Sequence, residues 1–273
     1  MSSQSFPRPS ATALAAAAVA GLAVCLPVCG ERRGPVSPPE SSRAAPSAGP
    51  TRSTELEAPP AAPTPSASAT PNPSRRRYTV AVIGDSLTDA RSGGGKFVDH
   101  LQARCKQSRF DNFGKGGDMV NQMRRRFERD VLANGTSYTH VVFFGGVNDL
   151  YSDLTAGRTP EKVEADLEAM FSAAKHRGFK VVAVTVAPWG GFTKFHNPKR
   201  QAATRELNEW ILRQAKEQRI DAAVDAYALL QCGESEKLCP DFAKPYRDGL
   251  HFGPAGHEKL GAALFDAAFS DCE

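Results

Sequence analysis

Residues 78–273 alternate between short apolar runs and segments of helical periodicity, and this alternation is the strongest constraint on the fold. Between the runs, apolar residues recur every three or four positions, which is typical of helices that bury one face. Such a chain folds into a parallel sheet with helices on both sides. We predict an α/β three-layer sandwich of the flavodoxin-like type with a five-stranded parallel sheet. The five expected strands are residues 79–83, 109–113, 141–144, 181–186 and 222–227.

The segment before this domain has a different composition. Of the chain's 20 prolines, 11 lie between Pro35 and Pro73, in a stretch that is rich in alanine, serine and threonine and contains few large apolar residues. Such a segment cannot bury enough surface to offset the entropy lost on ordering. We predict that residues 30–77 form a disordered linker and that residues 78–273 form one domain.

Residues 1–29 have the composition of a targeting segment. Ala11 to Cys29 is almost continuously apolar, and Arg8 precedes it. This pattern predicts an exported protein, either periplasmic, on the outer surface or secreted. The sequences ending at Cys25 and Cys29 each resemble a lipoprotein box, so a lipid anchor is one option. Cleavage of a signal peptide and retention as a membrane anchor are the others.

Four cysteines follow the targeting segment, and an even number agrees with export. Cys232 and Cys239 bracket a short polar loop that a disulfide would close. Cys105 ends the first expected helix and Cys272 follows the last, and these two helices should be neighbours. We predict the pairs Cys232–Cys239 and Cys105–Cys272. Two other pairings, or four free thiols, are the alternatives.

The charge of the chain argues against nucleic acid as a partner. A net charge of +4 is only mildly basic. The two arginine clusters, residues 75–77 and 124–126, are expected to be solvated at the linker end and on a helix surface. No close group of cysteine and histidine is present, so we expect no metal site.

A serine, a histidine and an aspartate with the chemistry of a nucleophilic triad follow the expected strands. Ser86 comes directly after the first strand. A serine hydroxyl becomes a good nucleophile only when a base removes its proton and an acid holds that base in place. Asp248 and His251 are three residues apart, so one tight turn can present both side chains. His257 is the rival base, but it falls in the last expected helix.

Three groups could donate hydrogen bonds to the oxyanion that forms when serine attacks an ester. Gly117 follows the second strand and can offer a backbone N–H with no side chain in the way. Asn148 follows the third strand and can offer a side-chain amide, and the backbone N–H of Ser86 is the third donor. Sites in parallel sheets form beyond the carboxyl ends of the strands, so we expect these groups at one edge.

These motifs resemble those of the SGNH, or GDSL-type, hydrolase superfamily over residues 78–269. Its four sequence blocks occur here in order, as GDSL at 84–87, N-x-G-x-x-G at 112–117, G-x-N-D at 146–149 and D-x-x-H at 248–251. The resemblance implies a serine esterase that needs no metal or organic cofactor. It implies Ser86 as nucleophile, His251 as base, Asp248 as orienting acid, and an oxyanion hole of Ser86, Gly117 and Asn148. Met119 departs from the threonine or serine that is frequent in the family.

The identity of the ester is left open. Trp189 and Phe192 follow the fourth strand and could stack on a sugar or line an acyl pocket, with ordinary loop packing as the alternative. A surface location favours small acyl groups, such as O-acetyl on carbohydrate or cell-envelope glycan. The alternatives are a lipase, lysophospholipase or thioesterase, an acyltransferase, and a non-catalytic glycan-binding module. We expect a monomer whose partner is a small-molecule or glycan ester.

Overall fold

The computed structural model describes residues 75–273, so the expected targeting segment and nearly all of the expected linker lie outside the described residues. Five strands form one all-parallel sheet in the order β2-β1-β3-β4-β5. This is the strand order of a flavodoxin-like sheet, and the predicted fold class is confirmed. The strands are β1 (Thr79–Gly84), β2 (Arg109–Gly114), β3 (His140–Phe144), β4 (Lys180–Val184) and β5 (Ala222–Val224).

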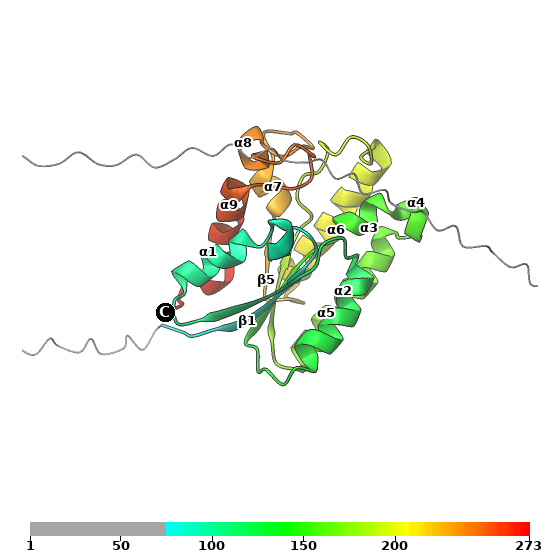
Figure 1. The fold of residues 1–273 in the computed structure, drawn as a ribbon. Helices are drawn as coiled ribbons and strands as arrows, with labels where there is room; N and C mark the ends of the chain where they lie inside the picture. Colours follow the sequence, from blue (N-terminus) through cyan, green and yellow to red (C-terminus); the bar gives the residue numbers. More distant parts are fainter. Residues whose placement is uncertain (1–74) are drawn as a thin grey trace, which may run out of the picture. The chain divides into compact units, whose positions relative to one another are not determined.

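Helices cover both faces of this sheet (Figure 1). Helices α1 and α9 lie on one face, and α2, α5 and α6 lie on the other. The described α-helices are α1 (Lys96–Arg104), α2 (Val120–Arg126), α3 (Val147–Tyr151), α4 (Asp153–Ala156), α5 (Pro160–His176), α6 (Pro198–Lys216), α7 (Ala226–Leu230), α8 (Pro240–Ala243) and α9 (Pro254–Leu264). A short 3-10 helix spans Ala90–Ser92, and π-helical turns extend α2 over Phe127–Leu132 and α9 over Phe265–Phe269.

The central strand β1 shows why the sequences of the strands are continuous apolar runs. Its side chains alternate between the two faces, and helices bury both. Val80 and Val82 pack in the core beneath α1 and α9, whereas Ala81 and Ile83 pack in the core beneath α2 and α5. A polar residue on either side of this strand would therefore be buried without a partner.

The carboxyl ends of all five strands are aligned. The parallel register places Gly84 of β1 opposite Gly114 of β2 and Phe144 of β3. Phe144 in turn aligns with Val184 of β4, and Val184 aligns with Val224 of β5. The segments that follow the strands therefore start from one edge of the sheet, which is where the candidate site residues lie.

The last strand is shorter than predicted. The expected strand at 222–227 ends at Val224, and helix α7 begins at Ala226. The reason is Asp225, whose side chain accepts a hydrogen bond from the backbone N–H of Ala228 and so caps the helix. The expected strand at 181–186 also ends early, at Val184, whereas Thr159 and Pro160 begin α5 as expected.

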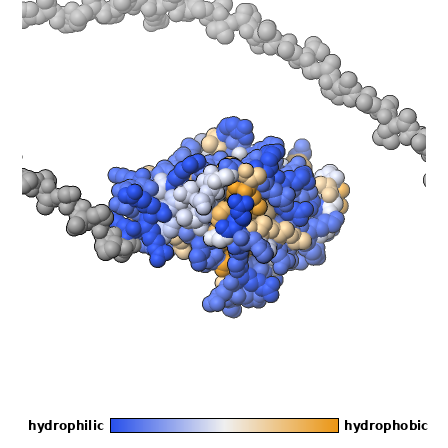
Figure 2. All heavy atoms as spheres, turned by 90° about the horizontal axis from the view of Figure 1, so that it is seen from below, coloured by the Kyte–Doolittle hydropathy of each residue, from blue (hydrophilic) through white to orange (hydrophobic). Residues whose placement is uncertain are grey.

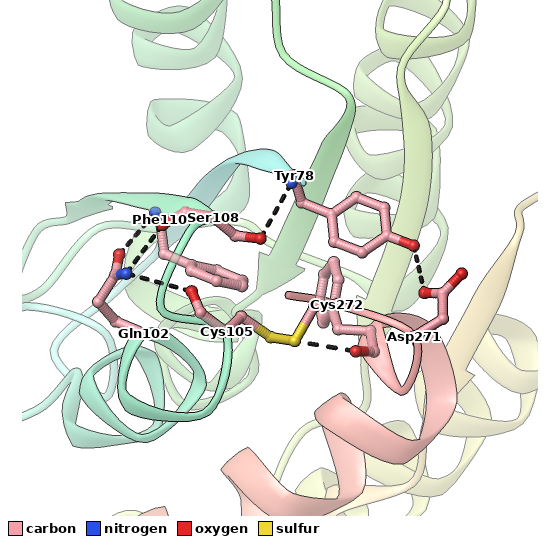
Figure 3. The surroundings of a disulfide bond; sticks show 8 residues. Tyr78, Gln102, Cys105, Ser108, Phe110, Asp271 and Cys272 are labelled. Carbon is pink, nitrogen blue, oxygen red and sulfur yellow. Dashed lines mark hydrogen bonds between the residues drawn. A yellow bond between two sulfur atoms is a disulfide. The ribbon is translucent and has the colours of Figure 1, made fainter. Parts of the chain in front are cut away.

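The structure pairs the four cysteines in the expected way. Cys105, directly after α1, bonds to Cys272, and their Cα atoms are 5.3 Å apart. Figure 3 shows that this disulfide lies close to Tyr78 at the start of the domain, whose N–H donates to Ser108 Oγ at 3.0 Å. The second disulfide joins the other two cysteines, Cys232 and Cys239, across a sequence separation of 7 residues.

Residues 76 and 77 contact the last residues of the chain. Arg76, assigned above to the linker, forms a parallel bridge with Cys272, and Arg77 pairs with Glu273 at 3.3 Å. The bridge at Arg76 is made by backbone hydrogen bonds, which the composition of the segment does not reveal. The end of the chain thus closes against residues 76 and 77.

The surface viewed from below is mainly hydrophilic, with a small group of hydrophobic residues near its middle (Figure 2). Within residues 75–273, no helix combines the length and the apolar character needed to cross a membrane.

Candidate active site

The nucleophile candidate Ser86 lies in a turn at the end of β1. Asp85 stabilises this turn, because its carbonyl accepts from Asp89 N–H at 2.9 Å and its Oδ1 accepts from Leu87 N–H at 2.9 Å. The first α-helix, α1, begins only at Lys96. The turn itself, and not a helix terminus, therefore presents the Ser86 hydroxyl.

A second turn, late in the chain, presents Asp248 and His251. Asp248 Oδ1 accepts the backbone N–H groups of Leu250 and His251, each at 2.9 Å. The other oxygen, Oδ2, lies 2.6 Å from His251 Nδ1. Partial burial opposes ionisation of Asp248, but these N–H donors and the His251 ring hold its pKa below the ordinary value.

The two turns meet at a hydrogen bond. His251 Nε2 lies 2.8 Å from Ser86 Oγ. Because a carboxylate can only accept, Nδ1 carries the proton that is shared with Asp248, and Nε2 is left to accept the proton of Ser86. Asp248, His251 and Ser86 therefore form one continuous hydrogen-bonded chain.

Close packing of backbone explains why the Asp248 turn contains a glycine. Gly249 has φ +74°, and a Cβ at this position would come within 2.0 Å of the carbonyl carbon of Gly191. A Cβ on Gly191 would in turn come within 2.8 Å of Gly249 Cα. The loop after β4 therefore supports the turn that carries His251.

The rival base His257 is in a different place. It is buried on α9 between the rings of Phe97 and Phe252. Burial lowers its pKa to about 4. Its side chain belongs to the packing of α9 against α1, and it is His251 that contacts Ser86.

The loop after β2 lies beside Ser86. A Cβ placed on Gly116 would be 3.8 Å from the Cβ of Ser86, and Gly116 N–H donates to Asp89 Oδ2 at 3.0 Å. The next residue, Gly117, has φ +79°, and a Cβ there would meet nothing within 4 Å. Glycine is therefore required at 117 for the backbone conformation rather than for space.

Asn148 in α3 is joined to this loop. The residue is 4% exposed, and its Nδ2 donates to the carbonyl of Asp118 at 2.9 Å. Its Oδ1 accepts from the hydroxyl of Tyr151 at 2.7 Å. Because Asp118 directly follows Gly117, this hydrogen bond joins Asn148 to the loop that contains Gly117. One N–H of the Asn148 amide has no partner among the described residues.

Comparison with known families matches residues 82–259 to the GDSL-like lipase/acylhydrolase family. The chain belongs to this family. Solved structures of similar fold include a GDSL-like lipase from Bacteroides thetaiotaomicron VPI-5482, at 22% identity over 69% of this chain and 86% of that chain, with a TM-score of 0.55. A search of curated proteins found no match.

Two acetyl xylan esterases are also among the similar structures. AlAXEase is 23% identical over 69% of this chain and 98% of its own, with a TM-score of 0.56. A catalytic mutant of Axe2 from Geobacillus stearothermophilus is 20% identical over 72% of this chain and 96% of its own, also with a TM-score of 0.56. At these identities the likeness shows the shared fold.

In this GDSL-family protein, one residue of the cluster 124–126 departs from the sequence prediction. Arg126 was expected to be solvated, but it is 9% exposed and its Nε pairs with Asp118. Its Nη1 donates to the carbonyl of Phe113 at 2.7 Å and its Nη2 to that of Gly84 at 3.1 Å. Arg126 therefore links the ends of β1 and β2 to the loop that carries Gly117.

The two aromatic residues that were candidates for substrate contact lie in different surroundings. Trp189 is fully buried, and its Nε1 donates to Thr204 Oγ1 at 2.9 Å. The burial and this core partner favour the alternative of ordinary loop packing for Trp189. Phe192 is only partly buried, and its ring lies 4.8 Å from that of Phe195.

Sequence reasoning also missed Tyr151 as a neighbour of the site. Its ring lies 6.0 Å from Phe192 and 5.4 Å from Phe195, while its hydroxyl contacts Asn148. The signal was the spacing, because residues three apart in a helix share a face. That signal required a helix at 147–151, which is too short to show a periodic pattern.

Proposed function

We propose that the protein is an extracytoplasmic serine esterase that removes small acyl groups, such as O-acetyl, from carbohydrate. The observation that carries the proposal is the hydrogen-bonded chain from Ser86 through His251 to Asp248. Membership of an acylhydrolase family supports hydrolysis of an ester bond.

In the first half of the reaction, His251 Nε2 takes the proton of Ser86 as Oγ bonds to the ester carbonyl carbon. Asp248 stabilises the imidazolium that results. The oxyanion receives hydrogen bonds from the N–H groups of Ser86 and Gly117 and from the free N–H of Asn148 Nδ2. His251 then passes its proton to the leaving alcohol, and the acyl group stays on Ser86.

In the second half, water replaces the alcohol. His251 takes a proton from the water as its oxygen attacks the acyl-serine carbonyl. The same three donors hold the second oxyanion. When it collapses, the carboxylic acid leaves and the proton on His251 returns to Ser86 Oγ.

Two observations favour a small acyl group on carbohydrate outside the cytoplasm. Acetyl xylan esterases are among the proteins with a similar fold over nearly their full length. The two disulfides are typical of proteins that fold in an oxidising compartment.

Replacing Ser86 with alanine tests the mechanism. We expect Ser86→Ala to abolish hydrolysis of p-nitrophenyl acetate while the melting temperature changes little, because the side chain is small and lies in a turn. A fluorophosphonate probe should label the wild type and not the variant. Undiminished hydrolysis by Ser86→Ala would disprove the proposal.

A panel of esters tests the substrate class. We expect turnover to be highest with acetyl esters, including acetylated xylan and acetylated peptidoglycan, and to fall as the acyl chain lengthens. Preference for long acyl chains would instead assign the protein as a lipase or lysophospholipase. Transfer of the acyl group to an added glycan would identify an acyltransferase, and the absence of both turnover and fluorophosphonate labelling would leave a glycan-binding role.

A further inference from the structure

Tyr151 is the last residue of α3, and its hydroxyl lies against the side chain of Asn148. The two residues are three apart in one helix, so they share a face. The hydroxyl donates to Asn148 Oδ1 at 2.7 Å. Tyr151 is partly buried, and burial raises its pKa above the ordinary value. The hydroxyl therefore keeps its proton, and its donor role, throughout the neutral range.

The hydrogen bonds of the Asn148 amide account for its orientation. The carbonyl of Asp118 accepts one N–H of Nδ2 at 2.9 Å, and the Tyr151 hydroxyl satisfies Oδ1. Rotating the amide by half a turn would place Oδ1 against the Asp118 carbonyl, two acceptors facing each other. The second N–H is the only amide group left without a described partner, and its direction is set by the other two contacts.

We propose that Tyr151 is a positioning residue that holds the Asn148 amide in the orientation required of an oxyanion donor. This inference rests on the proposed function, in which that free N–H faces the reacting carbonyl oxygen. A donor fixed before the reaction stabilises the transition state without a reorganisation cost. Hydrogen bonding at Oδ1 also polarises the amide and strengthens its N–H as a donor.

The ring of Tyr151 is itself held in place by aromatic packing. Phe192 lies edge-on to it at 6.0 Å between ring centroids, and Phe195 lies at 5.4 Å. Both phenylalanines belong to the loop after β4, whose Gly191 packs on Gly249 in the turn between Asp248 and His251. The oxyanion donor and the turn that carries the base are therefore supported by the same loop.

A double-mutant cycle tests this role. Tyr151→Phe keeps the ring and its packing and removes the hydroxyl alone. We expect kcat on p-nitrophenyl acetate to fall by roughly tenfold, the factor that corresponds to one ordinary hydrogen bond, with KM nearly unchanged. Asn148→Ala should lower kcat by roughly a hundred- to a thousandfold. In the Asn148→Ala background, Tyr151→Phe should have no further effect, because its target is gone.

Tyr138→Phe is the matched control. Its hydroxyl also donates to a side chain, Asp111 Oδ2, at 2.9 Å, but it lies just before β3 at the opposite end of the strands. We expect this control to keep full activity and to change melting temperature by a similar amount to Tyr151→Phe.

Two results would overturn the inference. One is unchanged kcat in Tyr151→Phe, and the other is an equal loss in the presence and absence of Asn148, which would mean that the hydroxyl acts through general stability. Labelling of Ser86 by a fluorophosphonate distinguishes failure of the Tyr151 inference from failure of the proposed function. If the wild type is not labelled, the esterase mechanism fails, whereas labelling with an unchanged Tyr151→Phe rejects only the role of Tyr151.

Discussion

Asp85 is the neighbour of the proposed nucleophile, and its environment differs from that of Asp248. It is completely buried, its Oδ1 accepts from Leu87 N–H, and its Oδ2 has no partner among the described residues. Burial raises its pKa to about 7, although the Leu87 N–H and the nearby His251 oppose this. Asp248, by contrast, is held ionised by two backbone donors. The carboxyl groups of Asp85 and Asp248 therefore have different charges in mildly acidic solution.

The titration of Asp85 predicts how stability depends on pH. The folded protein keeps this carboxyl protonated up to about pH 7, whereas the unfolded chain ionises it near 3.8. Folding therefore takes up a proton between these values, and the Asp85 contribution to stability decreases as pH rises through that window. Asp85→Asn keeps the acceptor for Leu87 N–H but cannot ionise.

We therefore expect the melting temperature of Asp85→Asn, relative to the wild type, to rise as the pH is raised from about 5 to about 8. Thermal melts of both proteins across this range provide the measurement. A difference in melting temperature that stays constant with pH would contradict burial of an ionisable Asp85.

Between elements, the packing of α9 against α1 includes a buried histidine. His257 lies between Phe97 and Phe252, with ring centroids at 6.0 and 4.4 Å. Burial lowers its pKa from 6.5 to about 4, and Lys96 and His251 add to this. The unfolded chain binds a proton at this histidine near its ordinary pKa, so the stability of the helix pair is retained above about pH 6.5 and lost as pH falls toward 4.

Replacing His257 with leucine should weaken this acid sensitivity. We expect the free energy of unfolding of His257→Leu to fall less steeply than that of the wild type between about pH 6.5 and 4. A slope will remain, because burial also lowers the pKa of His140 to about 4. Denaturant unfolding at several pH values measures the slopes, and parallel curves would rule out a buried neutral His257.

The predicted elements and the missed ones differ in how local their signals are. The strands and the Ser86, Asp248 and His251 motifs were predictable because each depends on a few adjacent residues. Arg126 was not, because its burial depends on acceptors from the ends of β1 and β2 and from Asp118, which meet only in the fold. The choice between the two alternatives for Trp189 could not be made from the sequence for the same reason, since its partner Thr204 lies in α6.

For the whole domain, the disulfide Cys105–Cys272 closes most of the chain into one loop. Its sequence separation is 167 residues, against 7 for Cys232–Cys239. Because the loss of unfolded-state entropy grows with loop length, the long loop should contribute about 5 kcal/mol and the short one about 2 kcal/mol.

We expect replacing Cys105 and Cys272 with alanine to destabilise the protein more than replacing Cys232 and Cys239. Denaturant titrations of the two double variants, each beside the wild type, give the comparison. Equal losses, or a larger loss for the short loop, would show that loop length does not set the contribution of these disulfides.

The two ends of the described domain are neighbours. Arg76 N–H donates to the carbonyl of Asp271, and Glu273 N–H donates to that of Arg76, each at 2.9 Å. A short peptide could therefore join residue 273 to residue 76, and the chain could be reopened elsewhere as a circular permutant. The exposed turn at Asn134 and Gly135 suits new termini, because it precedes β3 and so lies at the opposite end of the strands from Ser86 and His251.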